Sequence, residues 1–186
     1  MLDQDFMLKC ADSLRELAND VQKTAIPSHQ EVILAYEDFS ASFPDSKLKS
    51  LVEWAGSGPV IYKFAILNGK HATSILHRFK CSKEKEKLNA KKNRTTARSY
   101  CRANLESSTL YVGSSLELRK RLREHFGYLG RTTYSMQLTH WLLPGDIKTL
   151  QLSVWKCAGL PARTVQALED HFWDRERPLL GKRGGR

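Results

Sequence analysis

The chain has 186 residues, of which 41% are hydrophobic and 27% are charged. These values exclude a disordered chain, and the length is sufficient to bury a core without disulfide bonds. The 30 Lys and Arg residues exceed the 20 Asp and Glu residues by ten, and this net charge of +10 favours a polyanion such as nucleic acid as the partner.

The remaining composition signals exclude several other classes. The 4 cysteines are scattered, with neither C-x-x-C nor a close His, so we expect free thiols in a reducing cytosol and no zinc site. The longest apolar run, residues 60–67, is short and contains Lys63, which argues against a membrane span. The first residues lack the basic start of a secretory signal. A cytoplasmic protein without a membrane partner is predicted.

Residues 1–56 are predicted to form an N-terminal helical appendage. Apolar residues recur there at helical spacing, at Phe6, Cys10, Leu14, Leu17 and Val21. Two further helices are predicted, over residues 29–39 after a capping-box pattern and over residues 45–54. The segment carries no chemical motif, so we expect a role in packing or dimerisation, with a DNA-gripping arm as the alternative.

The pattern changes to strands in residues 57–186, which we treat as a second domain. β-branched and aromatic residues over 59–67 are followed by Asn68-Gly69 and by alternating residues over 71–79, which predicts a β-hairpin.

A basic insertion is predicted at about residues 70–105, because residues 77–102 contain ten Lys or Arg and only two acidic residues. Such a run is either a solvated surface or a phosphate-contacting segment that holds a duplex without reading its sequence. The candidate DNA-binding residues are Lys63, Lys91, Lys92, Arg94, Arg98 and Arg102.

The next stretch combines a short strand, a turn and a charged helix. A strand over residues 109–112 ends at Gly113, and the pair Ser114 and Glu117 forms a capping-box pattern before a helix over residues 115–126. On that helix Arg121 and His125 are four residues apart and therefore project from one face.

The C-terminal third is predicted to contain a helix over residues 133–143, a strand over residues 147–157 and a long helix from about residue 161 to about residue 177. Glu169 lies beside the apolar stripe of this last helix. Residues 179–186 are expected to form a flexible basic tail.

The order of these elements, with their motifs, resembles the GIY-YIG nuclease superfamily over residues 58–186. Val60-Ile61-Tyr62 is a loosened match to the first motif, and Tyr111-Val112-Gly113 matches the second closely. Arg121 follows Tyr111 by ten residues, and His125 follows by four more, as in the family. The resemblance implies an α+β fold in which helices flank a small three-stranded antiparallel sheet.

The residues in this constellation suit phosphodiester hydrolysis. Arg121 can donate to two phosphate oxygens, and Glu169 can hold a hard Mg²⁺ ion, for which Mn²⁺ can substitute. Tyr62 or Tyr111 can orient or deprotonate the attacking water, and His125 can shuttle a proton near neutral pH. The resemblance implies that Tyr62 is nearer the base role and that Tyr111 positions the phosphate.

We therefore predict a Mg²⁺-dependent endonuclease of double-stranded DNA, of the restriction type. Cutting both strands with one site per chain favours a homodimer. The family has an asparagine about a dozen residues after the glutamate, where this chain has Leu179-Leu180-Gly181. One alternative is a nucleic-acid-binding protein without catalysis, whose site is disabled by the missing asparagine. Another is a repair or branched-DNA nuclease.

Overall fold

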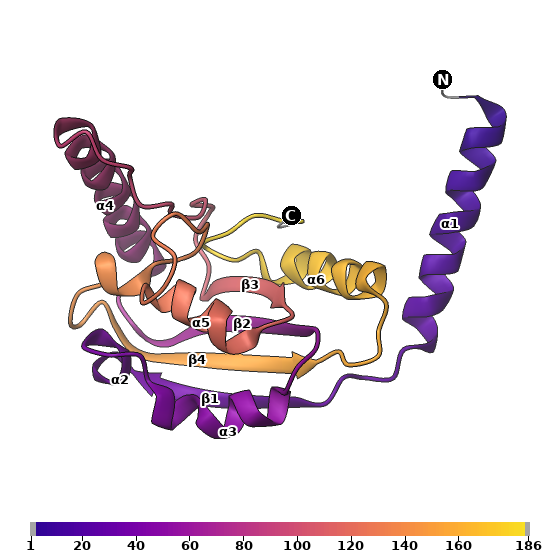
Figure 1. The fold of residues 1–186 in the computed structure, drawn as a ribbon, viewed down its shortest axis with the longest axis horizontal. Helices are drawn as coiled ribbons and strands as arrows, with labels where there is room; N and C mark the ends of the chain where they lie inside the picture. The colour runs from indigo at the N-terminus through magenta and orange to yellow at the C-terminus, as the bar shows by residue number, and fades with distance from the viewer. Residues whose placement is uncertain (1–2, 185–186) are drawn as a thin grey trace.

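The computed structural model describes residues 3–184 and has the predicted α+β class. Its four antiparallel strands form one sheet in the order β1-β4-β2-β3, one strand more than expected (Figure 1). The strands are β1 (His29–Ala35), β2 (Val60–Gly69), β3 (Thr109–Ser115) and β4 (Ile147–Lys156). The helices are α1 (Gln4–Lys23), α2 (Tyr36–Ser40), α3 (Asp45–Ala55), α4 (Ala72–Lys92), α5 (Leu118–Phe126), the 3₁₀ helix η1 (Leu138–His140) and α6 (Ala162–Glu176).

Strand β1 and the short helix α2 replace the helix predicted over residues 29–39, so that prediction was wrong. Val32 and Leu34 lie opposite Leu152 and Leu150 of β4, and this pairing favours the extended backbone. Residues 29–55, which we assigned to an all-helical appendage, contribute a strand and core side chains to the same sheet as the rest of the chain.

The predicted hairpin was also wrong, because residues 72–79 begin helix α4. Ile75 and Phe79, four residues apart, are buried on one side of this helix. A helical period therefore accounts for the apolar residues that we interpreted as strand alternation. Most of the basic insertion lies on α4 and on the segment that follows it.

The helix predicted over residues 133–143 is reduced to η1. Gln137 has a positive φ of 56°, and Ser135 forms a β-bridge with Tyr100. The Ser135 hydroxyl donates to the Glu124 carbonyl at 3.0 Å, so this segment makes contacts to distant backbone in place of helical bonds.

The other predicted helices and strands were confirmed, with shifts of a few residues at their ends. The capping box was wrong, however, because α5 begins only at Leu118. The Ser115 hydroxyl accepts from the Glu117 N–H at 3.0 Å, and the Ser114 hydroxyl donates to Glu169.

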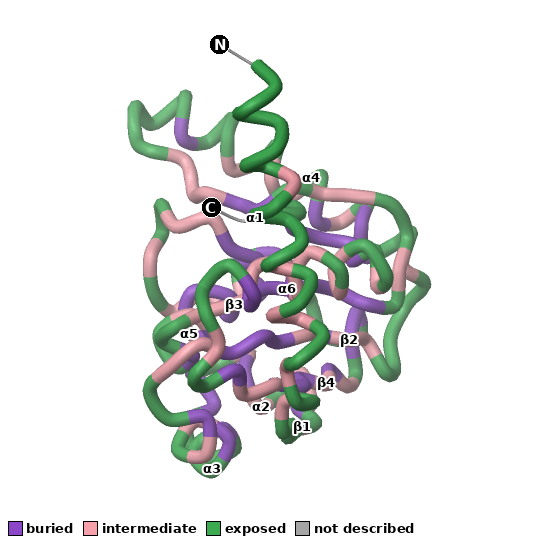
Figure 2. The backbone as a smooth tube through the Cα atoms, turned by 90° about the vertical axis from the view of Figure 1, so that its right-hand side faces the viewer, coloured by how far each residue is buried: buried purple, intermediate pink, exposed green. Residues whose placement is uncertain are grey.

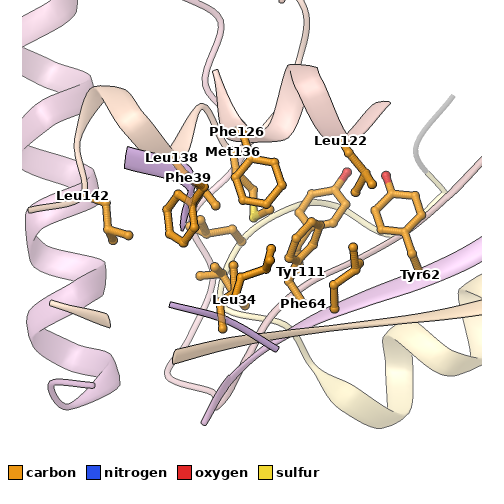
Figure 3. Close-up of a cluster of buried hydrophobic side chains, with 14 of the residues drawn as sticks. Leu34, Phe39, Tyr62, Phe64, Tyr111, Leu122, Phe126, Met136, Leu138 and Leu142 are labelled. Carbon is orange, nitrogen blue, oxygen red and sulfur yellow. The ribbon is translucent and has the colours of Figure 1, made fainter. Parts of the chain in front are cut away.

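The two faces of the sheet bury different clusters. Alternate β2 residues such as Tyr62 and Phe64 face the main core with α5, and Figure 3 shows them beside Leu122 and Phe126 of that helix. Ile61, on the opposite face, packs in a smaller cluster with Val165 of α6. Helices α5 and α6 thus lie on opposite faces of the sheet.

Strand β3 is an edge strand, and only its first half is covered. The N–H groups of Leu179 and Leu180 donate to the carbonyls of Thr109 and Leu110 at 2.8 and 2.9 Å. Leu179 and Leu180 are fully buried, so the expectation of a flexible tail was wrong for its first residues. Residues 185–186 of that tail, like residues 1–2, lie outside the described residues.

Two helices project from the body on the side where β3 lies. Figure 1 shows α1 and α4 extending in this direction, and Figure 2 shows the same arrangement from the side, with α1 exposed along most of its length. Within residues 3–184, no helix is both long enough and apolar enough to cross a membrane.

Candidate active site

A cavity of about 700 Å³ opens at the uncovered half of β3, between α5 and α6. Four of the five predicted catalytic residues line it, namely Tyr62 of β2, Tyr111 of β3, Arg121 of α5 and Glu169 of α6. Helices α5 and α6 lie on opposite faces of the sheet, and their side chains can meet at its edge strand, β3. His125, the fifth residue, is fully buried behind Tyr62.

Arg121 is the centre of the hydrogen-bond network in this cavity. Its Nε donates to the Tyr62 hydroxyl at 3.2 Å, and one Nη donates to the Tyr111 hydroxyl at 3.3 Å and to the Tyr134 carbonyl at 3.0 Å. The other Nη forms an ion pair with Glu124 at 2.8 Å. The guanidinium is therefore held in one orientation, with its charge partly balanced by a buried carboxylate.

The tautomer of His125 follows from its two neighbours. The Met136 backbone N–H donates to Nδ1 at 3.3 Å, so in the neutral ring the proton lies on Nε2, which donates to the Tyr62 hydroxyl oxygen at 2.9 Å. Arg121 is also a donor to this oxygen. Neither partner can accept the Tyr62 proton, which leaves that proton for a group in the cavity.

The pKa values of His125 and Tyr62 agree with a neutral His125 ring and a protonated Tyr62 hydroxyl. Burial lowers the pKa of His125 well below its usual value, and the Arg121 charge lowers it further. The predicted proton-shuttle role near neutral pH therefore does not fit His125, which instead orients Tyr62. Burial raises the pKa of Tyr62 to about 12, against the opposing effect of Arg121. Burial also raises the pKa of Tyr111 well above its usual value.

Protonation of His125 should destabilise the fold. Below about pH 6.5 the unfolded chain binds a proton at this residue that the folded chain excludes, so the free energy of unfolding decreases by up to about 1.4 kcal/mol per pH unit. Urea unfolding between about pH 8 and about pH 5 measures this slope. His125→Gln should flatten it, whereas His77→Gln, at an exposed histidine of α4, should not. Equal slopes in the two variants would contradict the assignment.

Two glycines allow the tyrosines to pack at the cavity. A Cβ on Gly113 would lie 2.8 Å from both the Tyr62 hydroxyl and the Tyr111 ring. A Cβ on Gly181, where φ is +109°, would lie 2.9 Å from the opposite edge of the Tyr111 ring. The Tyr111 ring is thus enclosed on both sides. Gly181, in the segment that lacks the expected asparagine, packs closely against the Tyr111 ring.

Glu169 is mostly buried at the cavity wall, and its carboxylate accepts from the Ser114 hydroxyl at 2.5 Å. Mg²⁺ commonly takes one or two carboxylates together with substrate phosphates and waters. The Glu169 carboxylate beside the open cavity fits such an ion. In the part of the chain that the structure describes, three His, Cys, Asp or Glu side chains do not gather into a metal cluster.

Sequence reasoning missed three residues of this site. Ser114 was assigned to a helix cap, and Glu124 was overlooked although it follows Arg121 by three residues and so shares its helix face. Tyr134 accepts from Arg121 through its carbonyl and from the Arg102 N–H through its hydroxyl. No sequence signal indicated this role, because the segment around Tyr134 has no regular structure.

The six predicted DNA-binding residues do not form one cluster. Lys63 lies on the α6 face, where it pairs with Glu176 at 3.4 Å. Arg98 donates to Gln137 at 2.9 Å, and Arg102 is exposed next to Tyr134. The remaining three, Lys91, Lys92 and Arg94, are exposed at the far end of α4.

Comparison of the chain with protein-family models, curated proteins and solved structures found no match.

Proposed function

We propose that this protein is a divalent-metal-dependent endonuclease of double-stranded DNA, with a GIY-YIG-like site. The observation that carries the proposal is the meeting of Tyr62, Tyr111, Arg121 and Glu169 at one cavity, from four separate elements. The same four residues are those that the resemblance to GIY-YIG nucleases groups together.

The side chains divide the work of phosphodiester hydrolysis. Arg121 supplies fixed positive charge for the pentavalent phosphate, and its hydrogen bond to the Tyr111 hydroxyl aligns that tyrosine with the same phosphate. A phosphate that enters would compete with Glu124 for the guanidinium. The Tyr62 hydroxyl, held by His125 and Arg121, first loses its own proton to solvent in the cavity. The resulting phenolate orients the attacking water and takes one proton from it as the oxygen–phosphorus bond forms.

Glu169 is the residue that would hold the metal, with Ser114 fixing the orientation of its carboxylate. The bound ion would add positive charge at the phosphate oxygens and at the leaving oxygen. Mg²⁺ is the expected ion, and Mn²⁺ should substitute.

The duplex would contact α4, because this basic helix projects on the side of the body where β3 lies (Figure 1), and β3 lines the cavity. Its exposed residues Lys91 and Lys92, with Arg94 beyond its end, would contact phosphates without reading the sequence. Arg102 would contact the strand nearer to the cavity, since Tyr134 connects its backbone to Arg121.

Incubation of supercoiled plasmid with the protein and Mg²⁺, against an EDTA control, tests this function. Conversion to nicked or linear DNA is expected only with the metal. Defined fragments would indicate a restriction-type enzyme, and scattered nicks or junction cutting would indicate a repair role. Salt-sensitive binding without cleavage would overturn the enzyme proposal.

The cleavage rate should rise with pH. Because the Tyr62 pKa is raised to about 12, this residue is almost wholly protonated at neutral pH. A rate that depends on its deprotonation increases by about tenfold per pH unit below that value. In single-turnover assays, Tyr62→Phe should lose both the fast cleavage and its increase with pH. Tyr36→Phe, outside the cavity, should retain both. A slope that persists in Tyr62→Phe would place the base elsewhere.

A further inference from the structure

Helix α1 is an amphipathic helix whose apolar side lacks cover along much of its length. It has 20 residues, and none of them is buried. Phe6, Met7 and Leu14 are 49%, 56% and 62% exposed. The helix is fixed to the body near its C-terminal end, where Arg163 of α6 pairs with Glu16 and Asp20 at 2.9 and 2.7 Å.

The apolar side has the spacing of a helix-pairing seam. Alternating steps of three and four residues give heptad positions a and d at Met7, Cys10, Leu14, Leu17 and Val21. The flanking e and g positions from residue 6 to residue 18 are uncharged, at Phe6, Ala11, Ser13 and Ala18. The charged residues of the same stretch occupy the other positions, at Lys9, Asp12, Arg15 and Glu16.

This surface does not suit DNA. Residues 4–23 contain four acidic residues (Asp5, Asp12, Glu16, Asp20) and three basic ones (Lys9, Arg15, Lys23), a net charge of −1 in a chain of net charge +10. The alternative of a DNA-gripping arm therefore lacks the positive charge that phosphates require.

The exposed part of the seam is complementary to itself. Cys10, a small residue, lies midway between the large apolar residues Phe6 and Leu14. A second α1 running in the opposite direction would place Phe6 and Met7 against Leu14, with the two Cys10 residues at the twofold axis. Such an isologous contact uses the same patch on both copies.

We propose that the protein forms a homodimer through an antiparallel pair of α1 helices centred on Cys10. The antiparallel direction separates the two basic bodies by a helix of about 30 Å, so their mutual repulsion is reduced. The proposal rests on α1 alone and is independent of the proposed chemistry.

Sedimentation equilibrium of the full chain over a wide concentration range tests the dimer. The unmodified protein should show a concentration-dependent dimer, and Leu14→Glu should remain monomeric. Leu88→Glu is the matched control, since Leu88 is 67% exposed on α4, and it should dimerise like the unmodified chain. A monomer at all concentrations, or a Leu14→Glu dimer of unchanged affinity, would overturn the proposal.

Cysteine cross-linking tests the geometry. Cys10 and Cys81 are the exposed cysteines, and Cys101 and Cys157 are buried. Under mild oxidation a covalent dimer should form in Cys81→Ser and be lost in Cys10→Ser. In a chain without both exposed cysteines, Met7→Cys mixed with Leu14→Cys should cross-link as a mixed dimer. Self-linkage of Met7→Cys alone indicates parallel helices and would refute the antiparallel arrangement.

Discussion

Glu169→Gln is expected to lower the Mg²⁺-dependent cleavage rate by ~10³-fold, since a catalytic metal contributes several kcal/mol and each 1.4 kcal/mol is about a factor of ten. The amide keeps the size of the side chain and can still accept from Ser114, so the fold should be retained. Single-turnover cleavage of supercoiled plasmid, with Mg²⁺ varied over a wide range, measures the effect.

Asp170→Asn provides the matched control. Asp170 is the adjacent carboxylate on α6, where it accepts from Gln166 and from the Gly184 N–H, and it is outside the cavity lining. This variant should cleave at nearly the normal rate. If Glu169→Gln also cleaves normally, or if both variants lose activity equally, Glu169 is not the metal ligand.

Arg121→Ala is expected to abolish cleavage and also to destabilise the fold by about 3–5 kcal/mol, because a buried ion pair that loses one partner leaves an uncompensated charge. The stranded group is Glu124, whose side chain is 11% exposed. The hydrogen bonds to Tyr62 and Tyr111 are lost in the same substitution. Urea unfolding and plasmid cleavage measure the two effects, and Arg119→Ala, at an exposed position of α5, should change neither strongly.

A double variant separates the two losses. Arg121→Met combined with Glu124→Leu removes both charges and keeps apolar volume, so stability should return to near that of the unmodified protein. Cleavage should remain absent, because the phosphate has lost its guanidinium. Activity in the stable double variant would show that Arg121 serves only the fold.

The central part of the site could be predicted because its signals are local. Tyr111 and Arg121 are ten residues apart in one strand-turn-helix unit, and each element has a strong period of its own. Tyr62 was predicted from its match to the first family motif and Glu169 from the position of the family's metal-binding glutamate on the last helix, and both residues line the cavity.

The wrong or missing predictions share one physical cause, which is that contacts between residues far apart in the sequence determine the structure at those places. Residues 29–35 are extended because β4, more than a hundred residues later, offers a pairing edge, as in the Val32–Leu152 pair. Local pattern could not reveal that partner, and a capping-box match at the same place favoured a helix. The network around Arg121 was hidden for the same reason, since Tyr134 reaches it from a segment without regular structure.

The position of Gly181 determines when the site can be completed during synthesis. Translation releases the chain from its N-terminus, and domains generally begin to fold in that order. Until residues 179–181 have emerged, the first half of β3 lacks its hydrogen-bonding neighbour and the Tyr111 ring lacks one wall. A nascent chain of the proposed nuclease would therefore hold all five predicted catalytic residues before it could align them, and cleavage would begin only after the C-terminal segment had closed.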